Sequence, residues 1–283
     1  MLTNPVWLSG TLLNPADATL LVTDHGITVG DGVFETIGVR NGVPVARTRH
    51  ITRLLWCAER MAMQLPLVGD IDAGIDAVLA ACDDATRASG RMRLTWTSGD
   101  GPLGSGRGPG PGSLIVWAEA ASAWAPTSKV AVCEWARNER SSVAGVKSTS
   151  YAENVVALTW AKQFGADEAL FLDTRGNVSE GTGSNIAFVV DGELLTPALS
   201  TGCLAGITRA LVIETSAVRE VEMDESVLRA CSGAAVLSST RDVHPISWLR
   251  LSDGTVREFD SVDPVLVAAN EALFGLYAEN LNP

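Results

Sequence analysis

The stretch that decides the fold lies in the second half of the chain, at residues 168–196, and reads EALFLDTRGNVSEGTGSNIAFVVDGELLT. Short apolar runs alternate here with turn-forming residues, a pattern typical of closely spaced strands. Turns are expected at Thr174-Arg175-Gly176 and at Asp191-Gly192. The predicted strands are Glu168–Asp173, Val178–Glu180, Asn185–Val190 and Glu193–Thr196. This succession predicts a sheet or a barrel-like β domain.

Helices are predicted on both sides of this stretch. Apolar spacing favours one helix over Ala152–Phe164 and another over Ile207–Ala217, which begins directly after Gly206. Val130–Trp135 is predicted as a further strand. The second half is therefore expected to be a β domain with peripheral helices.

The first half predicts alternating strands and helices. The expected strands are Val33–Arg40, Val43–Arg47, Arg91–Thr97 and Ser113–Glu119, and Asn41-Gly42 is a type I′ hairpin signal between the first two. Helical spacing begins at His50 and ends before Pro66, and a second helix is expected over Ile71–Ser89. Glycine and proline dominate Ser98–Gly112, so this segment is expected to be a loop that joins two paired strands.

The length of 283 residues is enough for two modest domains. We expect a small N-terminal α/β domain over residues 1–119, a linker over 120–127 and a larger C-terminal domain over 128–283. The predicted fold class is accordingly α/β (α+β), with a barrel-like second domain.

Composition excludes several classes of protein. The 21 Lys and Arg against 33 Asp and Glu give a net charge of −12, which disfavours nucleic acid as a partner. No apolar stretch is long enough to span a bilayer, and the first residues do not resemble a secretion signal. The five cysteines form no CxxC and the three histidines lie far apart, so we predict a cytoplasmic protein without a metal site.

The glycine-rich segment contains a formal GxGxxG match at Gly99–Gly104. A dinucleotide-binding motif must open a helix, and here glycine and proline continue instead. A flexible loop is the favoured interpretation.

Four features in the second half could carry chemistry. Lys147 is flanked by small and apolar residues, so it is either a buried nucleophilic amine or an ordinary surface lysine. Glu180 ends a short strand beside glycines, where it suits a ligand or a simple turn. Gly206, Ile207 and Thr208 form a helix N-terminus that suits an anion or a plain N-cap. Ser238, Ser239 and Thr240 follow an apolar run and offer hydroxyl groups to the same anion, or form a turn.

Taken together, these features match the needs of pyridoxal phosphate. The amine would form a Schiff base, the carboxylate would keep the pyridine nitrogen protonated, and the two hydroxyl-bearing segments would hold the phosphate dianion. We therefore predict pyridoxal 5′-phosphate as the cofactor.

The sequence resembles the class IV, fold-type IV pyridoxal-phosphate enzymes over nearly its whole length. The motifs that carry the resemblance are Gly30-Asp-Gly-Val-Phe-Glu-Thr36, His50-Ile-Thr-Arg53-Leu54, Lys147-Ser-Thr-Ser-Tyr151, Ser179-Glu180-Gly-Thr-Gly-Ser-Asn185 and Gly206-Ile-Thr208-Arg209. The resemblance implies that Lys147 is the catalytic Schiff-base lysine and that Glu180 pairs with the pyridine nitrogen. It implies a phosphate site made of Arg53, Gly206, Ile207, Thr208 and the run Ser238-Ser239-Thr240, with Tyr151 near the cofactor. Periodicity alone would leave Arg53 as a solvated residue.

Within this family the sequence looks most like aminodeoxychorismate lyase, which converts 4-amino-4-deoxychorismate to 4-aminobenzoate and pyruvate in folate synthesis. Thr36 stands where branched-chain aminotransferases have glycine, whereas Arg93 matches an arginine of theirs. A transaminase acting on branched-chain L-amino acids or on D-amino acids is the alternative, and a non-catalytic cofactor-binding protein is a third. Phe34, Thr36, Arg93 and Arg107 are the candidate substrate residues. The family also implies a homodimer and a small amine or amino-acid substrate.

Overall fold

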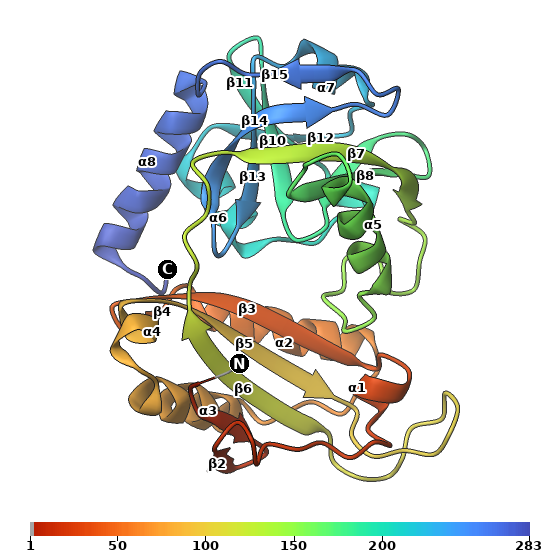
Figure 1. Ribbon diagram of the computed structural model, residues 1–283, viewed down its shortest axis with the longest axis vertical. Helices are drawn as coiled ribbons and strands as arrows, with labels where there is room; N and C mark the ends of the chain where they lie inside the picture. The colour runs from red at the N-terminus through yellow and green to blue at the C-terminus, as the bar shows by residue number, and fades with distance from the viewer. Residues whose placement is uncertain (1–2) are drawn as a thin grey trace. The chain divides into compact units, whose positions relative to one another are not determined.

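The computed structural model describes residues 3–283 and contains two compact units (Figure 1). The first comprises the described residues up to Ser122, with Val146–Tyr151 and Leu281–Pro283, and the second comprises Ala123–Gly145 and Ala152–Asn280. The boundary at Ser122 falls inside the predicted linker. The predicted continuous domain over 128–283 is interrupted, because two of its segments form hydrogen bonds with elements of the first unit.

The first unit is built on a six-stranded antiparallel sheet with the order β2-β1-β6-β5-β3-β4. Its strands are β1 (Val6–Leu8), β2 (Thr11–Leu13), β3 (Gly32–Arg40), β4 (Val43–Pro44), β5 (Ser89–Thr97) and β6 (Ser113–Ala120). Its helices are α1 (His25–Thr28), α2 (Arg47–Arg60), α3 (Val68–Ala81) and α4 (Asp84–Ala88).

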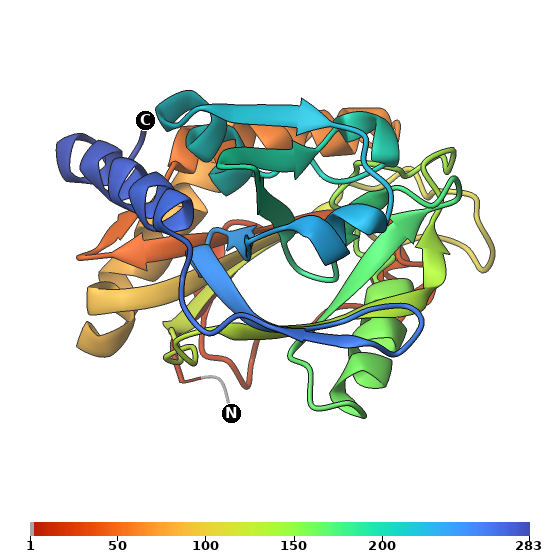
Figure 2. The same ribbon diagram turned by 90° about the horizontal axis from the view of Figure 1, so that it is seen from above.

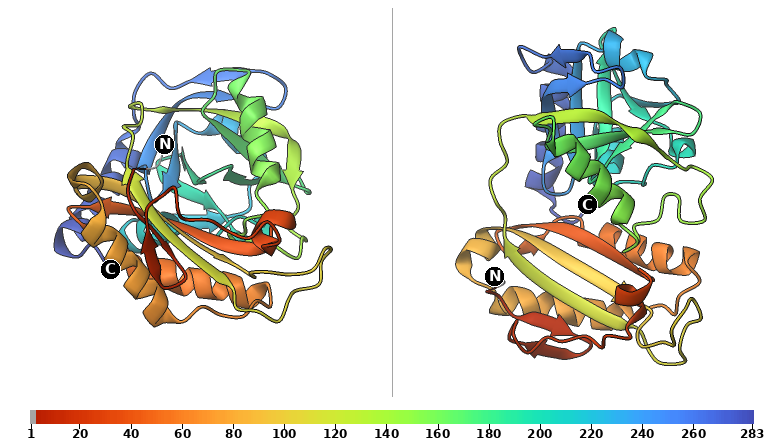
Figure 3. Two further views of the ribbon diagram at one scale, coloured as in Figure 1. Left: turned by 60° about the horizontal axis from the view of Figure 1, so that its bottom comes forward. Right: turned by 45° about the vertical axis from the view of Figure 1, so that its right-hand side comes forward.

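Helices α2 and α3 cover the same face of this sheet (Figure 3). Leu54 of α2 and Ile75 of α3 are fully buried against Ile37 and Leu94 of the strands. Side chains alternate along a strand, so residues next to Ile37 in β3 point away from the helices. Phe34 and Thr36 accordingly occupy the opposite face, and Thr36 lies directly across from Arg93 of β5.

The second unit is a curled nine-stranded sheet, seen end-on in Figure 2. Its main path is β12-β11-β10-β13-β14-β7-β8-β9, and β15 pairs with β14. The strands are β7 (Ser128–Arg137), β8 (Glu168–Asp173), β9 (Val178–Gly181), β10 (Asn185–Val190), β11 (Glu193–Pro197), β12 (Val218–Val221), β13 (Gly233–Ser238), β14 (Asp242–Arg250) and β15 (Val256–Glu258). Strand β9 also packs against β10, which brings the sheet back toward itself as a half-barrel.

Helices surround this sheet, as predicted from the sequence. They are α5 (Ala152–Lys162), α6 (Ile207–Thr215), α7 (Ser226–Ala230), α8 (Pro264–Glu279) and the short 3₁₀ helix η1 (Leu199–Thr201). Ala157 and Ala161 of α5 pack on Phe171 of β8, where small helix residues allow close approach to the sheet. The α/β class and the barrel-like second half are confirmed.

Two element predictions in the first half are wrong. The helix expected over Ile71–Ser89 is two helices, because the Asp83 carboxylate accepts the Thr86 amide at 2.7 Å and caps a new start. The strand expected over Val43–Arg47 ends at Pro44, and α2 begins at Arg47. The hairpin turn is confirmed, since Asn41 and Gly42 have φ values of 50° and 77°.

Among residues 3–283, no helix combines the length and the apolar character that crossing a bilayer requires.

The start of helix α2 lacks a cap of its own. Its N-cap residue is Ala46, which has no side-chain acceptor and adopts a left-handed φ of 52°. Residues from the far end of the sequence supply the missing partners. The Asn282 carboxamide oxygen accepts the Thr48 amide at 2.9 Å, and the Leu281 carbonyl accepts the Ala46 amide at 2.6 Å. We call the segment Leu281–Pro283 the clasp of α2.

We expect Asn282→Ala to lower the free energy of unfolding by about 1 kcal/mol, since an uncapped first turn leaves the Thr48 amide without its acceptor. Asn282→Asp keeps an acceptor and should stay close to the parent protein. Chemical denaturation of the three proteins measures the difference. Equal loss in both variants would show that the clasp acts by packing and not by capping.

Candidate functional site

Lys147 lies in the segment Val146–Tyr151, which runs beside strand β3 in the first unit. The Lys147 carbonyl accepts the Phe34 amide at 2.9 Å, and the Thr149 amide donates to the Gly32 carbonyl at 2.8 Å. The Cys57 thiol sulfur of α2 accepts the Lys147 amide at 3.4 Å. The contacts with Phe34 and Cys57 fix the backbone of Lys147, and the residue is half-buried. The predicted lysine is therefore held rigidly at its main chain.

The ring of Phe34 is the centre of a small cluster on this face of the sheet. The Lys147 Nζ lies 4.5 Å from the ring centroid, and Tyr151 meets the ring edge-on at a centroid distance of 5.3 Å. The Arg93 guanidinium carbon lies 3.3 Å from the same centroid. Four of the predicted site residues are thus brought together by one aromatic side chain.

Arg93 is a cation without a carboxylate partner among the described residues. Its polar contacts are two hydrogen bonds of 3.4 Å, to the hydroxyls of Thr95 and Thr36. Burial lowers the pKa of the Arg93 guanidinium to about 10, and the residue still carries its charge at neutral pH. A half-buried guanidinium that only hydroxyls and a ring contact is suited to receive an anionic group from a ligand.

Arg53 is not a solvated residue, because a buried carboxylate holds it. The Arg53 Nε and one terminal nitrogen donate to the two oxygens of Glu35 at 2.8 and 2.7 Å. His50 Nδ1 lies 2.7 Å from Glu35 Oε2. Glu35 and His50 are almost completely buried, and only 10% of the Arg53 side chain is exposed. Two residues of one helix therefore share one carboxylate of the neighbouring strand.

Burial and neighbouring charges have opposing effects on the ionisation of Glu35 and His50. Burial by itself would raise the pKa of Glu35, but the charge of Arg53 and its hydrogen bonds outweigh burial and hold that pKa well below its ordinary value. Burial is also the main effect on His50 and lowers its pKa. At neutral pH the group is thus an ionised Glu35 bound by a cationic Arg53 and a neutral His50.

Glu180 is placed at the end of β9 in the second unit. Its Oε2 accepts the Leu204 amide at 2.9 Å, and its Oε1 lies 3.3 Å from Arg137 Nε. The Arg137 guanidinium in turn packs over the Phe171 ring at 4.2 Å. The carboxylate that sequence analysis selected is therefore oriented by a backbone amide and by an arginine that the sequence did not point to.

The start of helix α6 has an open N-terminus. Gly206 is its N-cap residue and offers no side-chain acceptor to the amides of Ile207 and Thr208, which have no partner within the helix. Glycine is required here, because a Cβ on Gly206 would lie 1.8 Å from the Asn185 carboxamide oxygen. Such a terminus favours an anion.

The run Ser238-Ser239-Thr240 lies close to this helix start. Asn185 pairs with Leu237 across β10 and β13, so the residue that touches Gly206 is also the neighbour of the run. Ser238 ends β13, and Ser239 and Thr240 follow in a half-buried turn. The two predicted halves of a phosphate site therefore meet at one end of the same pair of strands.

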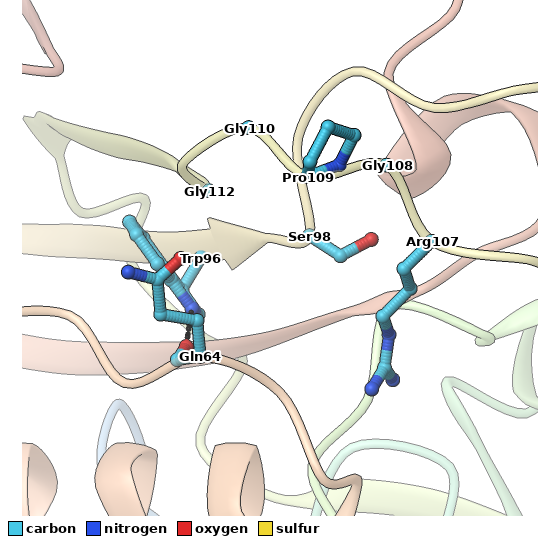
Figure 4. Close-up of a pocket in the computed structure, with 8 residues that line it drawn as sticks. All are labelled: Gln64, Trp96, Ser98, Arg107, Gly108, Pro109, Gly110 and Gly112. Carbon is cyan, nitrogen blue, oxygen red and sulfur yellow. Dashed lines mark hydrogen bonds between the residues drawn. The ribbon is translucent and has the colours of Figure 1, made fainter.

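Arg107 lies in the glycine-rich loop of the first unit and is engaged there. It donates to the Asp31 carboxylate at 2.6 and 2.7 Å and to the carbonyls of Met61 and Ala62. A cavity of about 180 Å³ opens beside it (Figure 4). It is lined by Gln64, Trp96, Ser98, Arg107, Gly108, Pro109, Gly110 and Gly112. Arg107 fastens the loop, and its contact with substrate stays a prediction.

Sequence reasoning missed the residues that hold the predicted ones. Glu35 and His50 stand in the quoted motifs, but no role was given to them, although a carboxylate inside an apolar strand was a signal. Asn185 also stands in a quoted motif without a role, whereas Arg137 gives no local signal because its partner Glu180 is distant in sequence. No group of three or more potential metal ligands is found in the part of the chain that the structure describes.

Comparison with known proteins gives consistent results. The family model described as amino-transferase class IV matches residues 32–249. A putative branched-chain-amino-acid aminotransferase of Methanocaldococcus jannaschii is 34% identical over 79% of this chain and 78% of its own length. A bifunctional aminodeoxychorismate lyase / D-amino acid transaminase of Mycobacterium tuberculosis is 27% identical over 93% of this chain and 99% of its own length.

The fold is also found among solved structures. The branched-chain aminotransferase of Thermoproteus uzoniensis superimposes with a TM-score of 0.88 at 24% identity and covers 99% of this chain and 97% of its own. This likeness bears on the fold.

We expect Glu35→Gln to lower the free energy of unfolding at pH 7 by about 3–5 kcal/mol, because the variant leaves Arg53 as a buried charge without its counter-charge. The native pKa of Glu35 is below its unfolded value, so its stabilisation is complete above the unfolded pKa and is lost as pH falls toward the native one.

The difference in the free energy of unfolding between the parent protein and Glu35→Gln should therefore narrow as the pH drops below about 4.3, the ordinary pKa of glutamate. Denaturant titrations at a series of pH values measure it. A difference that does not change with pH would contradict an ionised Glu35 in the folded protein.

Proposed function

Because the chain belongs to the class IV aminotransferase family, whose members are pyridoxal-phosphate enzymes, we propose that it transfers amino groups from branched-chain L-amino acids to 2-oxoglutarate. The family membership rests on a match to more than half of the chain. The relative that is 34% identical carries the branched-chain name, which favours this substrate class over the lyase that the sequence motifs suggested.

The residues of the second unit fit the cofactor's anionic and basic groups. The open N-terminus of α6 and the hydroxyls of the Ser238-Ser239-Thr240 run meet at one end of β10 and β13, where a Cβ at Gly206 would intrude. This arrangement suits a phosphate dianion. Glu180 presents an oriented carboxylate that suits a protonated ring nitrogen.

Pyridoxal phosphate supplies an aldehyde that binds amines covalently and a ring that accepts the electron pair of the amine-bearing carbon. With the cofactor bound, Lys147 Nζ would hold its aldehyde and would move the proton of the substrate's amine-bearing carbon. Glu180 would keep the proton on the ring nitrogen. The Ile207 and Thr208 amides would hold the phosphate. The family resemblance also implies a phosphate-binding role for Arg53, which Glu35 holds in the first unit.

The observation that points to an anionic group on the substrate is the position of Arg93. Its guanidinium stacks on the Phe34 ring that also contacts Lys147 Nζ, and no carboxylate of the described chain neutralises it. We propose that it binds a carboxylate of the substrate. The distal carboxylate of 2-oxoglutarate fits this role, and the hydroxyl of Thr36 lies next to the guanidinium to share it.

The lyase is the second candidate. It is favoured by Thr36, which stands where the branched-chain pattern has glycine, and by the bifunctional relative at 27% identity. Aminodeoxychorismate also carries carboxylates, so Arg93 fits it too. The homodimer, which the family resemblance implies, and the cytoplasmic location, which the cysteine pattern indicates, stay predictions.

One pair of assays separates the two candidates. We expect the purified protein to convert L-leucine when 2-oxoglutarate is present and to release no 4-aminobenzoate from aminodeoxychorismate without a keto acid. Lys147→Ala should abolish the turnover and the visible absorption of the bound cofactor. Release of 4-aminobenzoate without turnover of leucine would establish the lyase instead.

We expect Arg93→Met to raise the KM for 2-oxoglutarate by about tenfold to a hundredfold, the loss typical of a charge-assisted hydrogen bond to a carboxylate. The KM for leucine should change less, because leucine lacks the distal carboxylate. Arg91→Met is the matched control, since Arg91 lies on the same strand and pairs with Glu119 on the surface. A KM that stays unchanged in Arg93→Met would remove Arg93 from the substrate site.

A further inference from the structure

A buried ion pair in the second unit lies next to the turn that carries Ser238, Ser239 and Thr240. Glu168, the first residue of β8, accepts a hydrogen bond from Arg241, which stands in the turn between β13 and β14. Only 4% of each side chain is exposed. Burying two charges is costly, so a pair that is kept in such a place must be well supplied with further hydrogen bonds.

Glu168 uses its second oxygen to hold the turn that follows Glu180. Its Oε1 accepts the Thr182 hydroxyl at 2.6 Å and the Gly183 amide at 2.7 Å. The turn approaches the carboxylate closely, since a Cβ on Gly181 would lie 3.0 Å from the same oxygen. Glu168 thus fixes the backbone directly after the carboxylate assigned to the ring nitrogen.

Arg241 holds the hydroxyl-bearing turn from the other side. Its Nε donates to the Ser238 hydroxyl and its Nη1 to the Ser128 hydroxyl, each at 3.4 Å. The guanidinium also packs over the Trp124 ring at 4.6 Å from the centroid. Arg241 directly follows Thr240, and its amide donates to the Ser238 carbonyl at 3.1 Å, so Arg241 closes the turn that carries the hydroxyls.

The polar contacts continue from this pair to Glu180 itself. The Thr182 carbonyl accepts the Asn154 carboxamide at 2.6 Å, and the Asn154 oxygen accepts from Arg137 at 3.3 Å. Arg137 Nε then lies 3.3 Å from Glu180 Oε1. A continuous series of polar contacts within the second unit therefore joins the turn Ser238-Ser239-Thr240, which we call the phosphate turn, to the carboxylate of Glu180.

We propose that Glu168 and Arg241 are positioning residues that set the spacing between the phosphate turn and Glu180, and so the affinity for the cofactor. The proposal rests on the proposed assignment of Ser238-Ser239-Thr240 to the phosphate. Neither residue is assigned a contact with the cofactor. Their effect is exerted through the two turns that they hold.

The test is a titration of the apoenzyme with pyridoxal phosphate, followed by its visible absorption. We expect Glu168→Gln to raise the dissociation constant of pyridoxal phosphate by about tenfold, because a charge-assisted hydrogen bond is lost. The dissociation constant of inorganic phosphate for the apoenzyme should rise correspondingly. The kcat at saturating cofactor should change by less than about threefold, since a cofactor bound at saturation meets the same reacting groups. Arg241→Lys, which keeps the charge, should lie between the parent protein and Glu168→Gln.

The matched control is Asp173→Asn. Asp173 lies on the same strand, is fully buried and pairs with Arg175, and it holds the turn at residues 174–176 instead of the turns at 182–183 and 238–240. We expect it to lower the melting temperature without changing the dissociation constant. If Glu168→Gln and Asp173→Asn lower the melting temperature alike and neither changes cofactor affinity, the positioning role is overturned.

Ser239→Ala separates this proposal from the assignment beneath it. Weaker cofactor binding by Ser239→Ala together with unchanged binding by Glu168→Gln would overturn the positioning role and keep the phosphate assignment. Unchanged binding by Ser239→Ala would overturn the phosphate assignment of the turn, and with it the basis of the proposal.

Discussion

The carboxylate of Glu35 is the constraint on which the first unit depends. A charge without solvent exposure must be matched, and helix α2 supplies both His50 and Arg53 from positions one turn apart. This requirement fixes the rotation of α2 on the sheet. It also fixes the pleat of β3, so that Phe34 points to the other face, where Lys147 and Arg93 meet its ring. One strand thereby organises two sets of site residues.

The second unit depends on neutral groups at its candidate phosphate site. It offers an anion site from backbone amides and hydroxyls, with Gly206 pressed against Asn185 so that the helix terminus stays open. The chain carries a net charge of −12, which would repel an anionic ligand at long range. Its cations are therefore concentrated at short range: Arg241 is held by the buried Glu168, and Arg137 by the carboxylates of Glu153 and Glu180.

The sequence predicted what local patterns determine. Strands Glu168–Asp173 and Asn185–Val190 were predicted to the residue, because apolar runs there are bounded by turns. The prediction of one continuous helix over Ile71–Ser89 is wrong, because the Asp83 side chain caps the start of a second helix. The partner of Arg241 could not be predicted at all, since Glu168 lies 73 positions away and only the folded sheet brings the two together. The identity of the substrate likewise depends on groups whose surroundings no local pattern describes.

The clasp of α2 has a consequence for how the protein is made. Thr48 and Asn282 are 234 positions apart, so the first turn of the helix that carries His50 and Arg53 lacks its cap until almost all of the 283 residues have left the ribosome. Contacts of such long sequence separation close late and slowly. The emerging chain therefore carries an incompletely capped α2 throughout most of its synthesis, and a chain truncated shortly before Asn282 lacks the acceptor of the Thr48 amide.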